Sequence, residues 1–84
     1  MNADEIAQKV EEGVRSIANI EAGEEDFTRD AHLFELGYID SFSAVELVSY
    51  CEKTFEIEIS NDELALCPMN TVNEITKIIS DKLA

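Results

Sequence analysis

Apolar residues return at intervals of three and four along three stretches of this 84-residue sequence, and this spacing restricts the fold more than any other feature. Residues at such intervals share one face of an α-helix, where they can pack against a neighbouring helix. The stripes are Ile6, Val10, Val14 and Ile17; Ala44, Leu47, Val48, Cys51 and Phe55; and Val72, Ile75, Ile78, Ile79 and Leu83. We therefore predict helices over residues 3–19, over residues 41–54, and from residue 71 towards the C-terminus.

Signals for the starts of helices support these ranges. A polar residue followed by Glu three positions later can satisfy the free amides of a first helical turn. The pairs are Asn2 with Glu5, Ser60 with Glu63, and Thr71 with Glu74. The middle pair predicts a short helix near residues 61–66, which Pro68 ends because proline lacks an amide hydrogen. The predicted fold is all-α: one domain over residues 1–84, a small four-helix bundle of three longer helices and one short.

Two connections complete the predicted bundle. Residues 20–40 show no sustained period, and compact domains rarely keep so long a connection without a reason. Its apolar residues predict an ordered segment packed across the bundle; they are Phe27, Leu33, Phe34, Leu36 and Ile39. Residues 55–59, FEIEI, alternate as a strand does, but a lone strand has no partner here. We interpret them as an extended connection that buries Ile57 and Ile59.

Size and charge narrow the classes of function. A chain this short buries only roughly 60% of its unfolded surface, which leaves little room for a substrate cleft and argues against an enzyme. Its 19 acidic and 6 basic residues give a net charge of −13, so nucleic acid and anionic lipid are disfavoured as partners and basic protein surfaces are favoured.

Two cysteines, Cys51 and Cys67, are too few for a disulfide framework or a zinc site, and we expect no metal. The sequence shows no signal peptide and no apolar run of about 20 residues. We therefore expect a cytoplasmic protein that does not insert into membranes, and we expect it to be a monomer.

Residues 37–47, GYIDSFSAVEL, place Ser41 where the long connection becomes a helix. A serine at this position is most often a structural N-cap. Here Asp40 can take that role, and Ser43 pairs with Glu46 at the spacing of a capping box. Ser41 is partly redundant as a cap, so its hydroxyl is either structural or presented for chemistry. Spacing alone leaves both alternatives open.

The stretch DSFSAVELVSYCEKTFEIEIS resembles the central segment of acyl and peptidyl carrier proteins, which are modified by 4'-phosphopantetheine. Their Asp-Ser pair opens the second helix, and a Val-Glu-Leu-Val run, an aromatic residue and an Ile-acid-Ile stretch follow. In this sequence these are Asp40 and Ser41, residues 45–48, Phe55 and residues 57–59. Leu33, Phe34, Leu36 and Gly37 upstream and TVNEI at residues 71–75 also fit. The resemblance covers nearly the whole chain in order.

The resemblance implies a carrier that catalyses nothing itself. A phosphopantetheinyl transferase would attach the arm of coenzyme A to Ser41, with Asp40 as motif partner that helps to hold a divalent ion in the transferase complex. The thiol of the arm would carry an acyl or aminoacyl group as a thioester. A loading ligase or transferase and downstream synthase enzymes, each with a basic docking patch, would be the further partners.

Acidic residues dominate residues 35–63, where Lys53 is the one basic residue. Such a surface beside the attachment site should steer basic partners towards it. We predict Glu46 and Glu52 as partner contacts, with Phe42 and Val45 as an apolar centre beside them.

Departures from the family pattern bear on the pathway. The segment from Gly37 to Asp40 is one residue longer than in fatty-acid carriers, and Phe42 replaces the usual Leu or Met. This form looks more like peptidyl, D-alanyl or other specialised carriers, and the cargo stays open. The main rival is a carrier-like interaction module that never receives the arm. A hydrolase built on Ser41 and His32 is disfavoured, because the sequence has no G-x-S-x-G turn.

Overall fold

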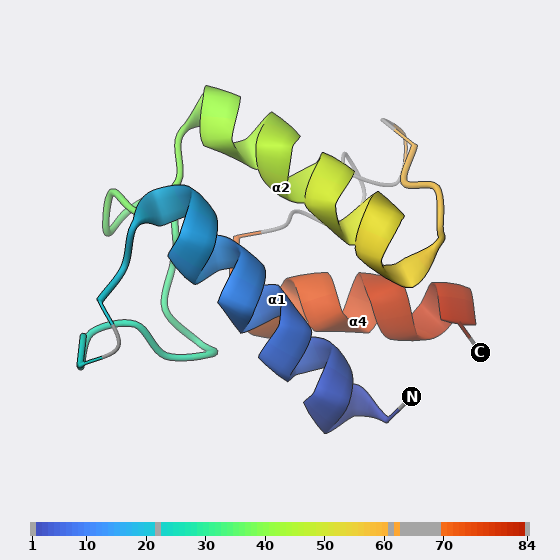
Figure 1. The fold of residues 1–84 in the computed structure, drawn as a ribbon, viewed down its shortest axis with the longest axis horizontal. Coiled ribbons are helices and arrows are strands. Elements are labelled where there is room, and N and C mark those ends of the chain that lie inside the picture. The colour runs from blue at the N-terminus through green and yellow to red at the C-terminus, as the bar shows by residue number, and fades with distance from the viewer. Residues whose placement is uncertain (1, 22, 61, 63–69, 84) are drawn as a thin grey trace.

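Three helices form the regular structure of a computed structural model that describes residues 2–21, 23–60, 62 and 70–83 (Figure 1). They are α1 (Ala3–Ala18), α2 (Ser41–Phe55) and α4 (Val72–Leu83), and the described residues contain no strand. The all-α prediction is therefore confirmed. The predicted short helix near residues 61–66 lies, apart from Asp62, outside the described residues, so the count of four helices stays a prediction. None of the described helices has the length and apolar character needed to cross a membrane.

The ends of the helices follow local signals that the sequence carries. The side chain of Asn2 accepts a hydrogen bond from the amide of Glu5 at 2.8 Å, and Thr71 Oγ1 accepts one from the amide of Glu74 at 3.1 Å. Both capping pairs are confirmed. Helix α1 ends one residue earlier than predicted because Asn19 adopts the left-handed conformation, with φ of 56°, which is typical of a helix C-cap.

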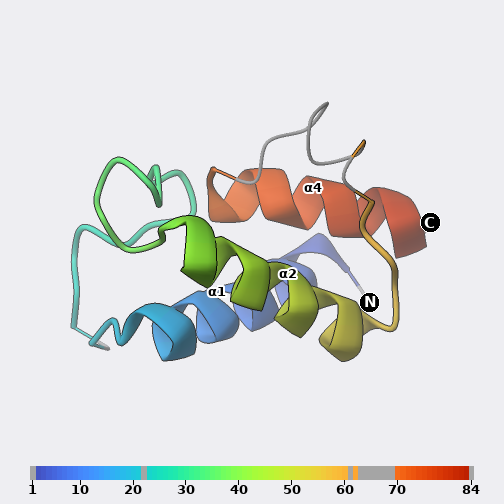
Figure 2. The ribbon, with the colours of Figure 1, turned by 90° about the horizontal axis from the view of Figure 1, so that it is seen from above.

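The core lies between the three helices, with α1 packed against both α4 and α2 (Figures 1 and 2). Each predicted stripe supplies buried side chains, and the connections add others. The core consists of Ile6, Ala7, Val10, Val14, Phe27, Leu33, Ile39, Leu47, Cys51, Phe55, Ile59, Val72, Ile75 and Ile79. One residue of the third stripe is misplaced: Leu83 is 43% exposed because it is the last residue of α4.

Gly13 of α1 lies against Tyr50 of α2. A methyl group added to Gly13 would lie 2.4 Å from Tyr50 Cε2, so only glycine fits against this ring. The Tyr50 hydroxyl donates a hydrogen bond to the backbone oxygen of Lys9 at 2.8 Å, which fixes the ring across α1. The two helices run in opposite directions, so the end of α1 lies near the start of α2 (Figure 1).

The connection from α1 to α2 is tied to α1 and to the chain at and just before the start of α4. Leu33 is fully buried, and its amide donates to the backbone oxygen of Asn70 at 2.8 Å. The Arg29 side chain forms ion pairs with Asp4 and Glu11 of α1, and its backbone oxygen accepts from the amide of Asn73 at 3.0 Å. These contacts fix the course of the chain that leads into α2.

Not every apolar residue of this connection packs as predicted. Phe27, Leu33 and Ile39 are buried, but Phe34 is 39% and Leu36 49% exposed. The turn closes through the amides of Tyr38 and Ile39, which both donate to the Leu33 oxygen, and these bonds leave the intervening residues on the outside.

Candidate functional site

Asp40 starts helix α2. Its backbone is extended, with φ of −121° and ψ of −171°, and its carboxylate accepts a hydrogen bond from the amide of Ser43 at 2.9 Å. This is the geometry of an N-cap, which satisfies one of the free amides of the first turn. Of the two alternative caps that the sequence offers, the structure uses Asp40, and Ser43 contributes the amide that Asp40 binds.

Ser41 is the first residue of α2 and is exposed to solvent. Because Asp40 caps the helix, the Ser41 hydroxyl is not needed for that purpose. It stands at the N-terminus of a 15-residue helix, where the aligned peptide dipoles and the free amides favour a negatively charged group. The structure thus presents a hydroxyl at a position where an attached phosphate is electrostatically favoured.

The hydrogen bond from the Ser43 amide, with a further one from the Ser43 side chain, lowers the pKa of Asp40 below its usual value of 3.8. A carboxyl group with a lowered pKa in the folded state stabilises the fold above the pKa of the unfolded state, and this contribution disappears as the pH falls through the lower, folded-state value. Asp40→Asn should therefore reduce stability at pH 6, and the difference from the parent should shrink below about pH 4.

Urea unfolding followed by circular dichroism at several pH values measures this effect. Glu25→Gln, an exposed carboxyl in the preceding connection, is the matched control and should show little difference from the parent at any pH. A difference between Asp40→Asn and the parent that stays constant from pH 6 to pH 2 would show that the cap does not depend on the carboxylate.

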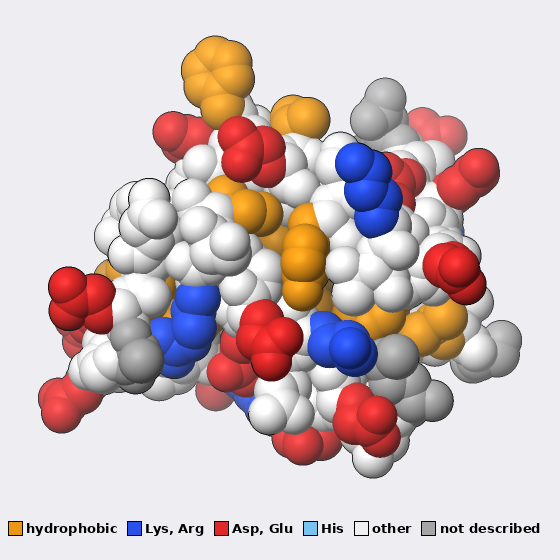
Figure 3. Space-filling model, viewed as in Figure 1, with side chains coloured by type: hydrophobic (Ala, Val, Ile, Leu, Met, Phe, Trp, Pro, Cys, Tyr) orange, Lys and Arg blue, Asp and Glu red, His pale blue; other side chains and the backbone are white. Residues whose placement is uncertain are grey.

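Apolar and acidic side chains surround the start of α2. Phe42 is 84% and Val45 68% exposed, and Glu46 is exposed beside them. Figure 3 shows apolar side chains at the surface where α1 and α2 meet, with both acidic and basic groups around them. The structure thus brings three of the predicted partner contacts, Phe42, Val45 and Glu46, to the first turns of one helix.

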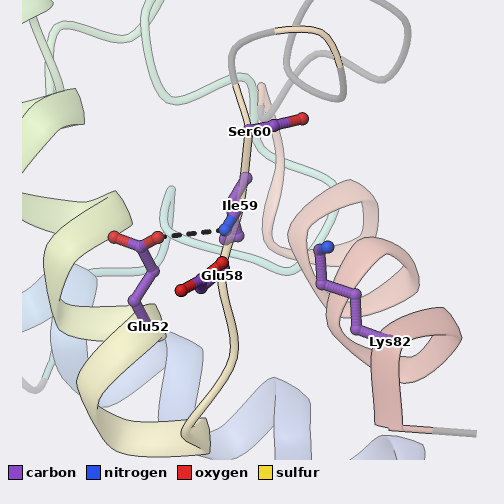
Figure 4. Close-up of a pocket in the computed structure, with 5 residues that line it drawn as sticks. All are labelled: Glu52, Glu58, Ile59, Ser60 and Lys82. Atoms are coloured by element: carbon purple, nitrogen blue, oxygen red, sulfur yellow. Dashed lines mark hydrogen bonds between the residues drawn. The ribbon is translucent and has the colours of Figure 1, made fainter.

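Glu52 lies apart from them. It is eleven residues after Ser41, about 16 Å further along the helix axis, and its Oε2 accepts a hydrogen bond from the amide of Ile59 at 3.0 Å. It borders a separate hollow together with Glu58, Ile59, Ser60 and Lys82 (Figure 4). Its carboxylate fixes the connection that follows α2, where Ile59 is buried and Ile57 partly buried. Nothing in the sequence pattern indicates this internal role.

The structure also shows the surroundings of Cys51 and His32, the other residues with possible chemistry. Burial raises the pKa of the Cys51 thiol to about 12, so this thiol stays protonated at neutral pH. His32 lies in the connection before α2, where its Nδ1 accepts a hydrogen bond from the amide of Glu35 at 3.2 Å. Among the described residues, no group of three or more His, Cys, Asp and Glu side chains is arranged to hold a metal ion.

The residues at the start of α2 fit a bulky group attached through a phosphodiester. Ser41 and Phe42 both face solvent, so an arm of any length can leave the hydroxyl without displacing a core residue. The Asp40 carboxylate is engaged with the Ser43 amide, and the free amides of the first turn would lie near a phosphate attached at this position.

Comparison with known proteins agrees with this geometry. The model of a family described as "Phosphopantetheine attachment site" matches residues 8–79, a range that includes Asp40 and Ser41. The chain is also 36% identical over 53 residues to the D-alanyl carrier protein of Streptococcus uberis (strain ATCC BAA-854 / 0140J), an alignment that covers 63% of this chain and 67% of that protein. The protein is therefore a member of the family of carrier proteins that bear a covalently bound 4'-phosphopantetheine.

Proposed function

We propose that Ser41 carries the phosphopantetheine and that the chain presents an acyl or aminoacyl group, held as a thioester, to partner enzymes. The observation that carries this proposal is the exposed Ser41 hydroxyl at the start of α2, left available because Asp40 caps the helix. A transferase would join Ser41 Oγ to the phosphorus that bears the pantetheine arm in coenzyme A. The hydroxyl loses its proton, the pyrophosphate bond breaks, and the nucleotide half of coenzyme A leaves.

The residues around Ser41 suit this role by position and charge. The positive end of the α2 dipole stabilises the attached phosphate by about 0.3–1 kcal/mol. The thiol of the arm then supplies the thioester chemistry when it is loaded, while the protein keeps the attachment point in solvent. The chain itself needs no catalytic group, which agrees with its small core.

Partners would recognise the surface next to the tether. Phe42 and Val45 offer exposed apolar area, and Glu46 adds a negative charge that attracts a basic patch. Glu52 would contribute to the field of this surface from further along the helix. The expected partners are a phosphopantetheinyl transferase, a ligase or transferase that loads the arm, and downstream synthase enzymes, all in the cytoplasm.

Two observations bear on the cargo: the similarity to a D-alanyl carrier protein and the length of the loop before Ser41. A D-alanyl carrier protein is among the similar proteins, and the Gly37–Asp40 segment has the longer form of peptidyl and D-alanyl carriers. We therefore place the chain in a specialised pathway rather than in fatty-acid synthesis. An aminoacyl group such as D-alanine is the first cargo to test with activating ligases.

Attachment is tested by co-expression with a broad-specificity phosphopantetheinyl transferase, followed by intact mass measurement. The parent should gain the mass of one phosphopantetheine, and Ser41→Ala should gain none. Ser43→Ala is the matched control, because it removes a neighbouring hydroxyl but keeps the amide that Asp40 binds, and it should be modified like the parent. If neither the parent nor Ser43→Ala gains mass while both are folded, the chain is a carrier-like interaction module instead.

Recognition through the acidic surface gives a second prediction. Glu46→Lys should slow modification by the transferase several-fold at low salt, because it places a positive charge where a basic partner docks. The difference should fade at about 1 M salt, where the Debye length falls to roughly 3 Å. Glu25→Lys makes the same change of charge in the connection before α2 and should have a smaller effect. Equal slowing by both variants would point to net charge alone.

A further inference from the structure

A shallow groove of about 440 Å³ runs between α1 and α2. Its walls come from Gly13, Ser16 and Ile17 of α1 and from Val45, Ser49 and Tyr50 of α2. Two charged residues of α2, Glu46 and Lys53, also border it. Figure 3 shows the apolar side chains between the two helices in this view. The predicted partner contacts Val45 and Glu46 thus belong to a surface whose other half comes from α1.

The groove is formed before any partner arrives. Gly13 is buried against the ring of Tyr50, and the Tyr50 hydroxyl is bonded to the Lys9 oxygen, so the floor is fixed. Short side chains at Ser16 and Ser49 leave the groove open to solvent. The apolar surface of Ile17 and Val45 then remains partly uncovered, with Val45 68% exposed. Covering such an apolar surface with an apolar side chain of a partner lowers the free energy of the complex.

The two charges give the groove a direction. Glu46 and Lys53 are seven residues apart, which is two turns and about 10 Å along the helix axis. The groove therefore has a negative end nearer the start of α2 and a positive end nearer its finish. An occupant with opposite charges at the same separation and an apolar side chain between them would satisfy all three features.

Two other occupants fit less well. A second copy of the chain would also carry a net charge of −13, and the repulsion opposes self-association. The prosthetic arm would start from Ser41, but Tyr50 comes nine residues later, which is two and a half turns. Tyr50 at the floor therefore lies on the face of α2 opposite to Ser41, and among the residues of α2 that border the groove only Val45 lies one turn after Ser41 on the same face. A helix of another protein, laid into the groove by its apolar face, is a common mode of recognition.

We propose that the α1–α2 groove seats a helix of a partner enzyme, with an apolar side chain between Ile17, Val45 and Tyr50, a basic residue over Glu46 and an acidic residue over Lys53. This inference rests on the proposed function, since a carrier must be held by the enzymes that load and unload it. Ser41 is not among the residues that border the groove, so docking there leaves the attachment point at the start of α2 uncovered. The partner can then hold the carrier while the arm reaches an active site.

Helical peptides test the proposal on the isotope-labelled holo protein. The first peptide carries Arg and Glu seven positions apart with Leu between them. The second replaces Arg by Glu, so that reversing its direction on the groove cannot restore the missing pair. The parent should bind the first peptide about tenfold more tightly, and the amide signals of Gly13, Ser16 and Ser49 should shift most.

Compensating charges make the test specific. Glu46→Lys should lose the preference for the first peptide and gain affinity for the second, whereas Glu25→Lys, with the same net charge, should behave like the parent. Ser41→Ala, which cannot carry the arm, should bind the first peptide as the holo protein does, so that failure of the tether and failure of the groove are told apart. Equal affinities of both peptides for the parent, no binding, or shifts confined to other surfaces would overturn the proposal.

Discussion

Replacing Leu33 by alanine is expected to lower the free energy of unfolding by about 2–5 kcal/mol, because it removes a fully buried side chain and leaves a cavity. Leu33 belongs to the connection between α1 and α2, not to a helix. Its amide donates to the Asn70 oxygen at 2.8 Å, and its own oxygen accepts from the amides of Tyr38 and Ile39 at 3.0 and 3.1 Å. One residue thus joins Asn70, two residues before α4, to the turn that leads into α2.

The neighbouring Leu36 provides the matched control. It is the same residue type in the same connection, but it is 49% exposed. Leu36→Ala should change the free energy of unfolding by about 0.5 kcal/mol or less. Urea unfolding followed by circular dichroism measures both variants. Because small domains have only about 5–15 kcal/mol of stability in total, Leu33→Ala should also raise the fraction of unfolded chain visibly. Similar losses in both variants would contradict the packing described for this connection.

The helices could be predicted from the sequence because their determinants are local. The stripes that start with Ile6 and Val72 need only the 3.6-residue period of the helix, and the caps at Asn2 and Thr71 need only a side chain and an amide three residues away. The all-α class and most of the helical core follow from these short-range rules. Asp40 as a possible cap follows from the same local rules, whereas Ser41 as the attachment point rests on the resemblance to carrier proteins and stays a proposal.

What the sequence could not show depends on contacts between distant segments. Nothing local distinguishes the buried Leu33 from the exposed Leu36, and the difference arises from a turn that Leu33 joins to the distant Asn70. Glu52 was predicted as a partner contact from its charge, and its hydrogen bond to Ile59 appears only when the chain turns back after α2.

Only half of the proposed docking groove could be named from the sequence, for the same reason. Val45 and Glu46 lie in the motif, but Ser16 and Ile17 lie about 30 residues earlier and carry no pattern that marks them as surface. They join the groove because Gly13 lets α1 approach the ring of Tyr50. A glycine within a helical stripe is therefore a useful signal of close helix packing.

This close approach gives the last prediction. In an open helix, Gly13→Ala would stabilise the fold by about 1 kcal/mol, since alanine favours the helix. Here the new methyl group would lie 2.4–2.8 Å from three carbon atoms of the Tyr50 ring. The ring cannot retreat without loss of its hydrogen bond to the Lys9 oxygen. Crowding of this kind costs about 1–3 kcal/mol, so we expect a net loss of about 1 kcal/mol, measured by urea unfolding.

Two further variants identify the cause. Gly23→Ala lies in a connection where nothing is within 4 Å of the new methyl group, and it should be neutral or slightly stabilising. In a Tyr50→Leu background the ring is gone, and Gly13→Ala should then stabilise the protein, a reversal that only contact between the two residues explains. If Gly13→Ala instead stabilised the parent, α1 and α2 would be further apart than described. The groove would then lack the fixed floor on which its recognition of a partner helix depends.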